Sequence, residues 1–339
     1  MKLEIVAISA LFALAAAPAL ARTAACCRAP AGTLVQVELA EPVGTLSYKT
    51  GATFALRLAA PLIVNGRIVL RAGTPGVGDI VESSKAGMGG KPAKLVLAAR
   101  YLQKGGVHVP LEGLQLAAGG RNNGTAASAV GLTGLIFGPL GFVGLAVSGG
   151  DVTFPAGTKA TAKLAADVAL PSLGLATRAQ IAAAAATARA AAEAPAGAIA
   201  IPPPPSGQGQ VVFFRRKSVL GTAQWFKVRE GGQALGKLTN GAYFVQVTTP
   251  GTHTYTSVYE PEFKDHLTLQ IDAGETYFVE GAITKALIVG QADLSPSSRA
   301  AFDKASKDLK PAPPLTDDSA ASANNTADSG EVGGAPPRQ

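Results

Sequence analysis

The side chains that most often carry acid–base or metal chemistry are few in this sequence, and they are dispersed. His253 follows a Pro-Gly turn and His266 opens a strand-like run, and neither stands at metal-ligand spacing from a cysteine or carboxylate; the third histidine is His108. The glycine-rich run at 87–91 lacks the spacing of a phosphate-binding loop, and the serine-hydrolase elbow Gly-x-Ser-x-Gly is absent. We therefore predict no catalytic residue, no cofactor and no bound metal, and we expect that the protein is not an enzyme.

The densest group of ionisable side chains lies near one predicted loop, at Glu260, Glu262, Asp265 and His266. These residue types can hold a metal or transfer a proton. On a solvated loop, however, such side chains are usually just exposed polar groups. We interpret the stretch as a recognition loop of a binding protein. Its candidate recognition residues are Tyr255, Tyr259, Glu260, Glu262 and His266.

A second stretch, between Arg121 and Asp151, has no ionisable side chain at all. On a helix, its four glycines spaced three, four and three residues apart would share one face, and Gly-x-x-x-Gly is a helix-dimerisation spacing in membranes. Three interpretations stay open: a buried hairpin or short helix over the first domain, a segment that enters a bilayer, and an apolar loop that docks a partner. The candidate membrane or self-assembly residues are Gly131, Gly134, Ile136, Phe137, Gly138, Leu140, Gly141 and Phe142.

The N-terminal residues 1–21 have the form of a secretory signal peptide, with Lys2, an apolar run and small residues before a cleavage point after Ala21. Cys26 and Cys27 are the only cysteines, and adjacent Cα atoms, about 3.8 Å apart, lie closer than in most disulfides. Residues 23–26 resemble part of a lipobox without its leucine, so lipidation of Cys26 stays an alternative to simple cleavage. We expect an exported protein of the periplasm or outer envelope.

Charge is uneven along the chain. Residues 22–171 carry 14 Lys+Arg against 7 Asp+Glu, which suits either an anionic headgroup surface or an ordinary solvated face. The basic run Arg215-Arg216-Lys217 is interpreted as a strand edge that discourages edge-to-edge pairing. We expect an envelope protein or a membrane surface as partner, self-association through the uncharged segment, and no nucleic acid.

Regular short strands dominate the stretch from Gln210 to Ala282. Glycine-containing turns separate runs rich in β-branched and aromatic residues, a pattern that favours a β-sandwich or small barrel. We predict seven strands, at 211–216, 224–230, 234–238, 242–247, 252–257, 266–271 and 276–282. Large rings should form most of the core, and the candidates are Trp225, Phe226, Tyr243, Phe244, Tyr277 and Phe278.

Two runs in this stretch carry a family resemblance. YFVQVTTPGTHTYT at 243–256, followed by LTLQIDAGETYFVEGAI at 267–283, resembles the DUF 2846 family, a domain of unknown function in secreted and lipid-anchored bacterial proteins. The likeness covers residues about 210–290. It implies a prealbumin-like β-sandwich and brings no catalytic residues with it.

An earlier series of short strands, at 33–39, 53–58, 66–72, 76–83, 94–102, 108–116, 151–157 and 158–168, predicts an all-β first domain. Ala-Gly-Thr occurs at 31–33, 72–74 and 156–158, each time before a strand, and suggests hairpins reused within one all-β domain. The strand-turn VNGRIVLRAGT at 64–74, a later LVL strand and the glycine-rich insert also resemble, at approximate spacing, the periplasmic β-barrel of type IV secretion channel cores.

Between and after these domains the composition changes. Thr177 and Gln180 have capping-box spacing before an alanine-rich run that Pro195 ends, and a polyproline stretch follows. Ser295-Pro296 is interpreted as the start of a short helix. We predict a mainly β protein: signal peptide 1–21, β-domain 31–170 with the apolar segment 122–150, helical spacer and linker 171–209, sandwich 210–309 and disordered tail 310–339.

These features favour an exported envelope protein that acts as a binding, anchoring or assembly module. Two alternatives stay open. One is a hydrolytic enzyme whose site is assembled from dispersed acids between the domains. The other is a subunit of a secretion channel, which predicts a ring-shaped oligomer through the first domain.

Overall fold

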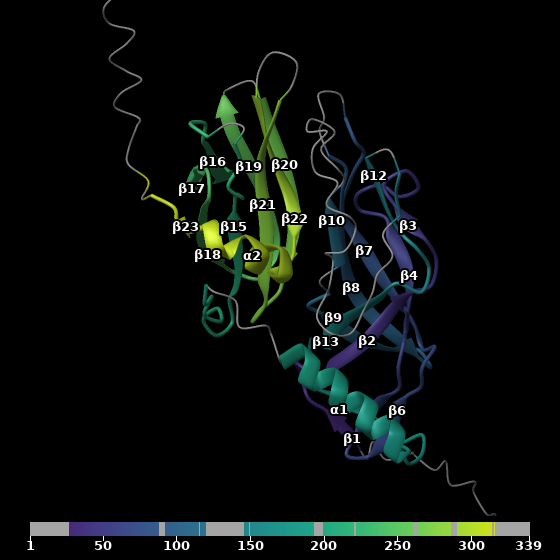
Figure 1. Ribbon diagram of the computed structural model, residues 1–339. Helices are drawn as coiled ribbons and strands as arrows, with labels where there is room; N and C mark the ends of the chain where they lie inside the picture. The colour runs from purple at the N-terminus through teal and green to yellow at the C-terminus, as the bar shows by residue number, and fades with distance from the viewer. Residues whose placement is uncertain are drawn as a thin grey trace, which may run out of the picture.

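The computed structural model describes residues 27–87, 92–114, 116–119, 146–148, 150–192, 199–219, 222–260, 263–285, 290–313 and 315. The fold is mainly β, as predicted. Two β units lie side by side, and the helix α1 (Arg178–Ala192) lies at the lower end of the first (Figure 1). The signal peptide, Cys26 and the eight candidate membrane or self-assembly residues from Gly131 to Phe142 lie outside the described residues.

The first unit contains a closed barrel. Strands β8, β7, β4, β2, β13 and β9 follow one another antiparallel, and β9 pairs back onto β8. One edge of the long strand β8 pairs with β7. Its other edge pairs with β10 along the first half of the strand and with β9 along the second half, and the pairing with β9 closes the ring. The elements of this unit are β1 (Cys27–Ala29), β2 (Leu34–Leu39), β3 (Val43–Gly44), β4 (Thr53–Leu58), β5 (Leu62–Val64), β6 (Arg67–Leu70), β7 (Pro75–Ser84), β8 (Lys94–Lys104), β9 (Val107–Glu112), β10 (Leu116–Gly119), β11 (Ala146–Ser148), β12 (Asp151–Phe154), β13 (Lys159–Leu164) and β14 (Val168–Leu170).

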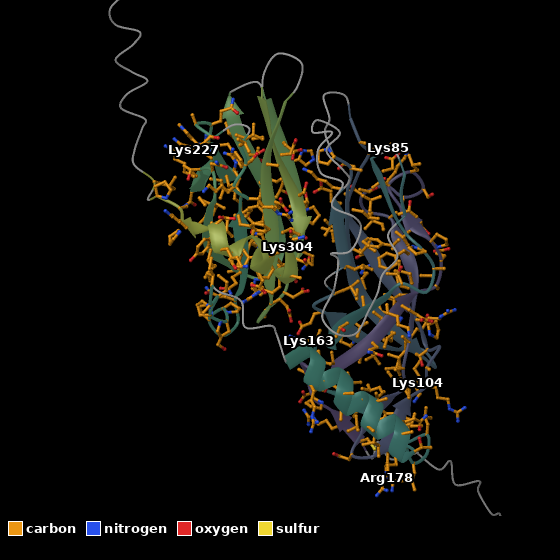
Figure 2. The ribbon with its side chains drawn as sticks, in the orientation of Figure 1. Lys85, Lys104, Lys163, Arg178, Lys227 and Lys304 are labelled. Atoms are coloured by element: carbon orange, nitrogen blue, oxygen red, sulfur yellow. The ribbon has the colours of Figure 1, made fainter. Side chains whose placement is uncertain are left out.

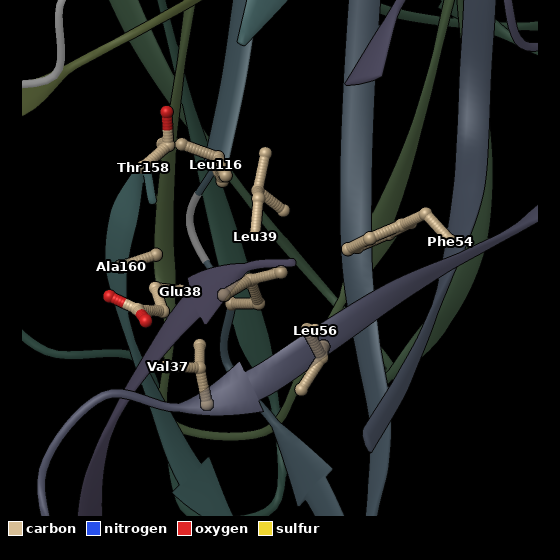
Figure 3. A pocket seen from close by; sticks show the side chains of 9 residues that line it. Val37, Glu38, Leu39, Phe54, Leu56, Leu116, Thr158 and Ala160 are labelled. Carbon is tan, nitrogen blue, oxygen red and sulfur yellow. The ribbon is translucent and has the colours of Figure 1, made fainter. Parts of the chain in front are cut away.

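Side chains fill the barrel. Burial alternates along β2 and β4, so every second residue points inward, as a half-buried strand requires. The space between Leu39, Phe54 and Leu116 has a cavity volume of about 0 Å³ (Figure 3). A barrel of this size closes on its own side chains, so its interior does not offer a ligand site there.

The three Ala-Gly-Thr segments form the same turn, as the sequence suggested. The N–H of Thr33, Thr74 and Thr158 donates in each case to the carbonyl three residues earlier, at 3.1–3.2 Å. The glycine before each threonine has a φ of 77°, 82° or 78°. Such positive angles are readily adopted by glycine, so the repeat encodes one turn used three times in one unit. The expected hairpins do not form, because each turn leads from a strand of another sheet into a strand of the barrel sheet.

The second unit is a β-sandwich, and all seven predicted strands are present. One sheet has the order β22-β21-β15-β18-β23 and the other β17-β16-β19-β20. An eighth strand, β22, occupies residues that the sequence analysis assigned to a helix start. The elements are β15 (Gly209–Phe214), β16 (Phe226–Glu230), β17 (Gln233–Leu238), β18 (Ala242–Thr248), β19 (Gly251–Glu260), β20 (Phe263–Ile271), β21 (Thr276–Lys285), β22 (Gly290–Ser297), α2 (Arg299–Ala305), η3 (Ser306–Asp308) and β23 (Lys310–Pro311).

The sandwich core contains most of the predicted rings. Phe226 and Phe278 are buried, and Tyr243, Phe244 and Tyr277 are partly buried against the core. The prediction for Trp225 was wrong. Its side chain is 37% exposed, and the Lys237 Nζ lies 3.7 Å from its ring centroid, so a cation–π contact takes the place of core packing.

The basic run after β15 does not protect a strand edge, which corrects the sequence interpretation. Strand β15 lies between β21 and β18 in the centre of its sheet. Arg215 is buried and donates to the Gln224 carbonyl at 2.6 Å, while Arg216 pairs with Glu280 at 2.9 Å. These cations therefore anchor the loop that follows the strand.

The segments between the two β units, helix α1 and the polyproline stretch, form specific hydrogen bonds. The capping box forms, with the Gln180 N–H donating to Thr177 Oγ1 at 3.2 Å and the Thr177 N–H donating to Gln180 Oε1 at 2.9 Å. The polyproline segment contacts the sandwich, since Gln210 Nε2 donates to the Pro202 carbonyl at 2.6 Å. No helix among the described residues is long and apolar enough to span a bilayer.

The C-terminal boundaries differ from the prediction. The N-cap of α2 is Ser298, three residues later than expected, because Ser295-Pro296 belongs to β22. The predicted disordered tail began at Lys310, but the Lys310 N–H donates to the Gly241 carbonyl at 2.9 Å as β23 joins the sheet. Apart from Leu315, residues after 313 lie outside the described part of the chain.

Candidate functional site

The contact between the two units is built around an unpaired strand edge. Strands β20 and β22 are outer strands of the two sandwich sheets, and both lie against the barrel, beside β7, β8 and β10 (Figure 1). Val96 of the barrel is buried within the sandwich core cluster, and Val81 packs against it. An exposed strand edge invites pairing with other chains, and here the barrel covers part of it.

A buried ion pair fixes one end of this contact. Lys94 of β8 and Asp265 of β20 form a salt bridge, and both side chains are 0% exposed. Lys94 also donates to the His266 carbonyl, and Asp265 accepts the Leu294 N–H of β22 at 2.9 Å. A buried ion pair is tolerated when further hydrogen bonds satisfy both charges, and these supply them across three strands.

Glu82 of β7 binds the same strand two residues beyond His266. Its Oε2 accepts the backbone N–H of Thr268, while its Oε1 has no hydrogen-bond partner among the described residues. Burial raises the pKa of the Glu82 carboxyl; the Thr268 N–H and the nearby Lys94 and His266 oppose that rise, and Asp265 adds to it. A barrel carboxylate thus replaces the neighbouring strand that an edge N–H normally bonds.

Carboxyl groups gather at the other end of the contact. The Gly113 N–H donates to Asp272 Oδ2 at 2.6 Å, and Lys163 pairs with Glu275, near the point where the two units meet (Figure 2). The Tyr277 hydroxyl also donates to Asp272 Oδ2, at 3.2 Å. Burial, with added repulsion from Asp272 and Glu275, raises the pKa of Glu112 in β9.

A groove of about 600 Å³ lies between the two ends. Its volume is within the usual range of ligand sites. Hydroxyl, amide, carboxylate and guanidinium groups line it together with aliphatic residues of different sizes. The lining residues are Thr50, Gly51, Thr53, Asp79, Ile80, Val81, Ala98, Ala99, Arg100, Leu111, Thr252, Gln270 and Asp272. We call this space the barrel–sandwich groove.

The paired side chains in the groove keep free hydrogen-bonding capacity. Arg100 Nε lies 3.0 Å from Asp79 Oδ2, and Thr252 Oγ1 donates to Gln270 Oε1 at 2.9 Å. The first pair comes from the barrel and the second from the sandwich. Because an arginine has five N–H donors and a glutamine amide has two, both walls can still bind a polar ligand.

The predicted recognition residues do not form a loop. Tyr255, Tyr259 and Glu260 belong to β19, and His266 belongs to β20, because the two strands pair almost to the tip of their hairpin. Tyr255 is fully buried, with its ring 5.0 Å from that of Phe213. It therefore packs the core and cannot contact a ligand.

The other predicted residues have different positions. His266 enters the contact with the barrel through its carbonyl. The side chains of Tyr259 and Glu260, and all of Glu262, lie outside the described residues. Asp265, which the sequence analysis treated as an ordinary solvated acid, is the buried partner of Lys94.

Sequence reasoning missed Glu82, Lys94 and every residue of the groove. Glu82 and Lys94 stand in strand-forming runs more than 170 residues from the strand they bind, and nothing local indicates a partner. No group of His, Cys, Asp or Glu among the described residues is arranged to hold a metal.

Comparisons with protein-family models, curated proteins and solved structures each found no match. The resemblances to the DUF 2846 family and to type IV secretion barrels therefore stay predictions.

Proposed function

We propose that this protein is an exported, non-catalytic binding module of the bacterial envelope, and that the barrel–sandwich groove is its recognition site. The observation that carries the proposal is the groove itself, with walls from both units that are held together at each end. A binding site benefits from such preorganisation because little entropy is lost when the ligand arrives.

The electrostatics of the groove support binding more than hydrolysis. Asp272 accepts hydrogen bonds from Gly113 and Tyr277, and Glu275 is paired with Lys163. A general acid or base must be free to reach a substrate proton. These two carboxylates are instead engaged in joining the barrel to the sandwich.

A hydrolytic enzyme is the second candidate, favoured by one observation. Glu112 has a raised pKa beside Asp272, which lines the groove, and a carboxyl group with a raised pKa can act as a general acid. The Glu112→Gln variant distinguishes the two functions. An enzyme would convert the captured ligand, and Glu112→Gln would lose this turnover but not the capture. The binding proposal expects capture without turnover in both the wild type and the variant.

Anchoring or self-assembly through the uncharged segment is a separate part of the proposal. It is supported by the sequence alone. Deletion of residues 126–147 should reduce the membrane-bound fraction or the oligomer size of the exported protein. Unchanged values of both would exclude this role for the segment.

Site-specific photo-crosslinking in cells tests the recognition site. A photoreactive residue at Thr252, which is exposed in the groove, should give a discrete adduct in the exported fraction. The same residue at Gln233, exposed on β17 of the same sheet, is the matched control and should not give it. No adduct from Thr252, or the same adducts from both positions, would overturn the proposal.

A further inference from the structure

We propose that the barrel–sandwich groove takes a short, extended peptide segment whose main chain pairs with Gln270 of β20. The inference rests on the proposed function, because it names the class of ligand for the same site. It comes from the way the barrel contacts β20. Glu82 accepts the backbone N–H of Thr268, and the Gly113 N–H donates to the Asp272 side chain, whereas no described group of the barrel bonds to the backbone of Gln270 between them.

The register of β19 and β20 sets the direction of each backbone group. Thr268 lies opposite Thr254 and Gln270 lies opposite Thr252. In antiparallel pairs, residues two apart on one strand point their N–H and C=O groups the same way. The Thr268 N–H leaves the hairpin towards Glu82 of the barrel, so the N–H and C=O of Gln270 also point away from β19.

Gln270 therefore presents an open donor and acceptor to the groove that its side chain lines. Among the described residues of the barrel, no group bonds to its backbone. An unpaired N–H and C=O on a strand edge are what peptide recognition by strand addition requires. The donor and the acceptor lie on one residue of the strand, which matches the paired N–H and C=O groups of a peptide main chain.

The two closed ends limit the length of the ligand. Glu82 covers Thr268 on one side, and the Gly113 N–H holds Asp272 on the other. At the rise of a β-strand, the four steps from residue 268 to residue 272 span roughly 14 Å. The groove thus accommodates about four extended residues rather than a long strand.

The walls also indicate the charge of the peptide. Asp79 and Asp272 face the groove with Arg100 as the lining cation, so the described lining carries one more negative charge than positive. Like charges across an interface are unfavourable. The floor includes Gly51, Ala98 and Ala99, which leaves room for side chains. We infer a neutral or basic segment with small polar side chains.

Selection from a random heptapeptide display library against the full mature protein tests the inference. The expected result is a set of enriched peptides that lack Asp and Glu and bind Thr252→Trp at least about tenfold more weakly, because the new ring fills the groove. Gln233→Trp, at the exposed first position of β17, should bind them as the wild type does. N-methylation of one ligand amide should weaken binding about tenfold, since it removes one main-chain donor.

Three outcomes overturn the inference: no enriched peptide, equal binding to Thr252→Trp, or no single amide whose methylation matters. The photo-crosslinking experiment separates this failure from that of the proposed function. A Thr252 adduct without any enriched peptide leaves the groove as the site and removes the peptide class. An oligosaccharide that binds the wild type but not Thr252→Trp would assign the groove to glycans instead.

Discussion

Replacing Lys94 by Met should strongly destabilise the fold. The substitution removes the cation while Asp265 stays buried, with the Leu294 N–H as its remaining partner among the bonds described above. Breaking a buried ion pair by removing one partner costs about 3–5 kcal/mol, because an uncompensated charge is left in a medium of low polarity. A domain is usually stable by about 5–15 kcal/mol in total, so this is a large share.

The double variant Lys94→Met with Asp265→Asn separates the cost of the unpaired Asp265 charge from the cost of the lost hydrogen bond. Asparagine keeps an oxygen that can accept the Leu294 N–H, and the site becomes neutral. The remaining loss is then that of a hydrogen bond to the His266 carbonyl, about 1–3 kcal/mol for a buried group left unsatisfied. The double variant should therefore be more stable than Lys94→Met alone by about 2 kcal/mol.

Urea unfolding of the mature protein measures these differences. Circular dichroism follows both β units, and fluorescence follows the sandwich because Trp225 is the single tryptophan. Lys85→Met is the matched control, since Lys85 is exposed (Figure 2) and such changes usually stay within about 0.5 kcal/mol. The reasoning would be refuted if Lys94→Met lowered the free energy of unfolding by less than about 1 kcal/mol, or if the double variant were no more stable than Lys94→Met alone.

Three further predictions concern other parts of the fold. Burial raises the pKa of Glu82 above its ordinary 4.5, so the contribution of Glu82 to stability is full below pH 4.5 and is lost as the pH rises through the folded pKa. The free energy of unfolding of the wild type minus that of Glu82→Gln, measured with urea, should therefore increase from pH 7 to pH 5. Parallel pH profiles of the two proteins would contradict this. Gly236→Ala should cost about 1–3 kcal/mol, since a Cβ there would lie 2.5 Å from the Phe244 ring, whereas Gly232→Ala meets nothing within 4 Å and should be near neutral by thermal unfolding. Phe302→Ala should cost about 3–5 kcal/mol and expose α2 to early hydrogen exchange, because its ring is the buried anchor of that helix; unchanged exchange of α2 would refute this.

The strands were predictable because their signals are local. Alternating burial along β2 and β4, and turns such as the one at Gly73, depend on neighbouring residues only. The same holds for the capping box of α1. Each of these features is encoded within a few residues, so one sequence suffices to find it.

Errors arose where a residue's environment depends on distant strands. Trp225 is of a residue type that usually packs in a core, yet its side chain is partly exposed and the Lys237 Nζ lies over its ring. Ser295-Pro296 resembles a helix start, but pairing with β21 incorporates both residues into β22. Local propensity is a weak prior that tertiary pairing overrides.

The candidate site was out of reach for the same reason. The groove exists because β20 lies along the barrel, and the residues that hold it there, Glu82 and Lys94, are more than 170 positions away in sequence. Asp265 was visible in the sequence as one acid in a polar cluster. Only the three-dimensional arrangement distinguishes its buried side chain from a solvated one.

Amide hydrogen exchange along β20, measured by NMR, tests the central claim most directly. The barrel is inferred to satisfy the edge of this strand at Thr268 and to leave it open at Gln270. The account predicts slow exchange at Thr268, comparable to the sandwich core, and fast exchange at Gln270, two residues away on the same edge. Fast exchange at both amides would show that the barrel does not cover the strand, and slow exchange at both would show that no open edge faces the groove.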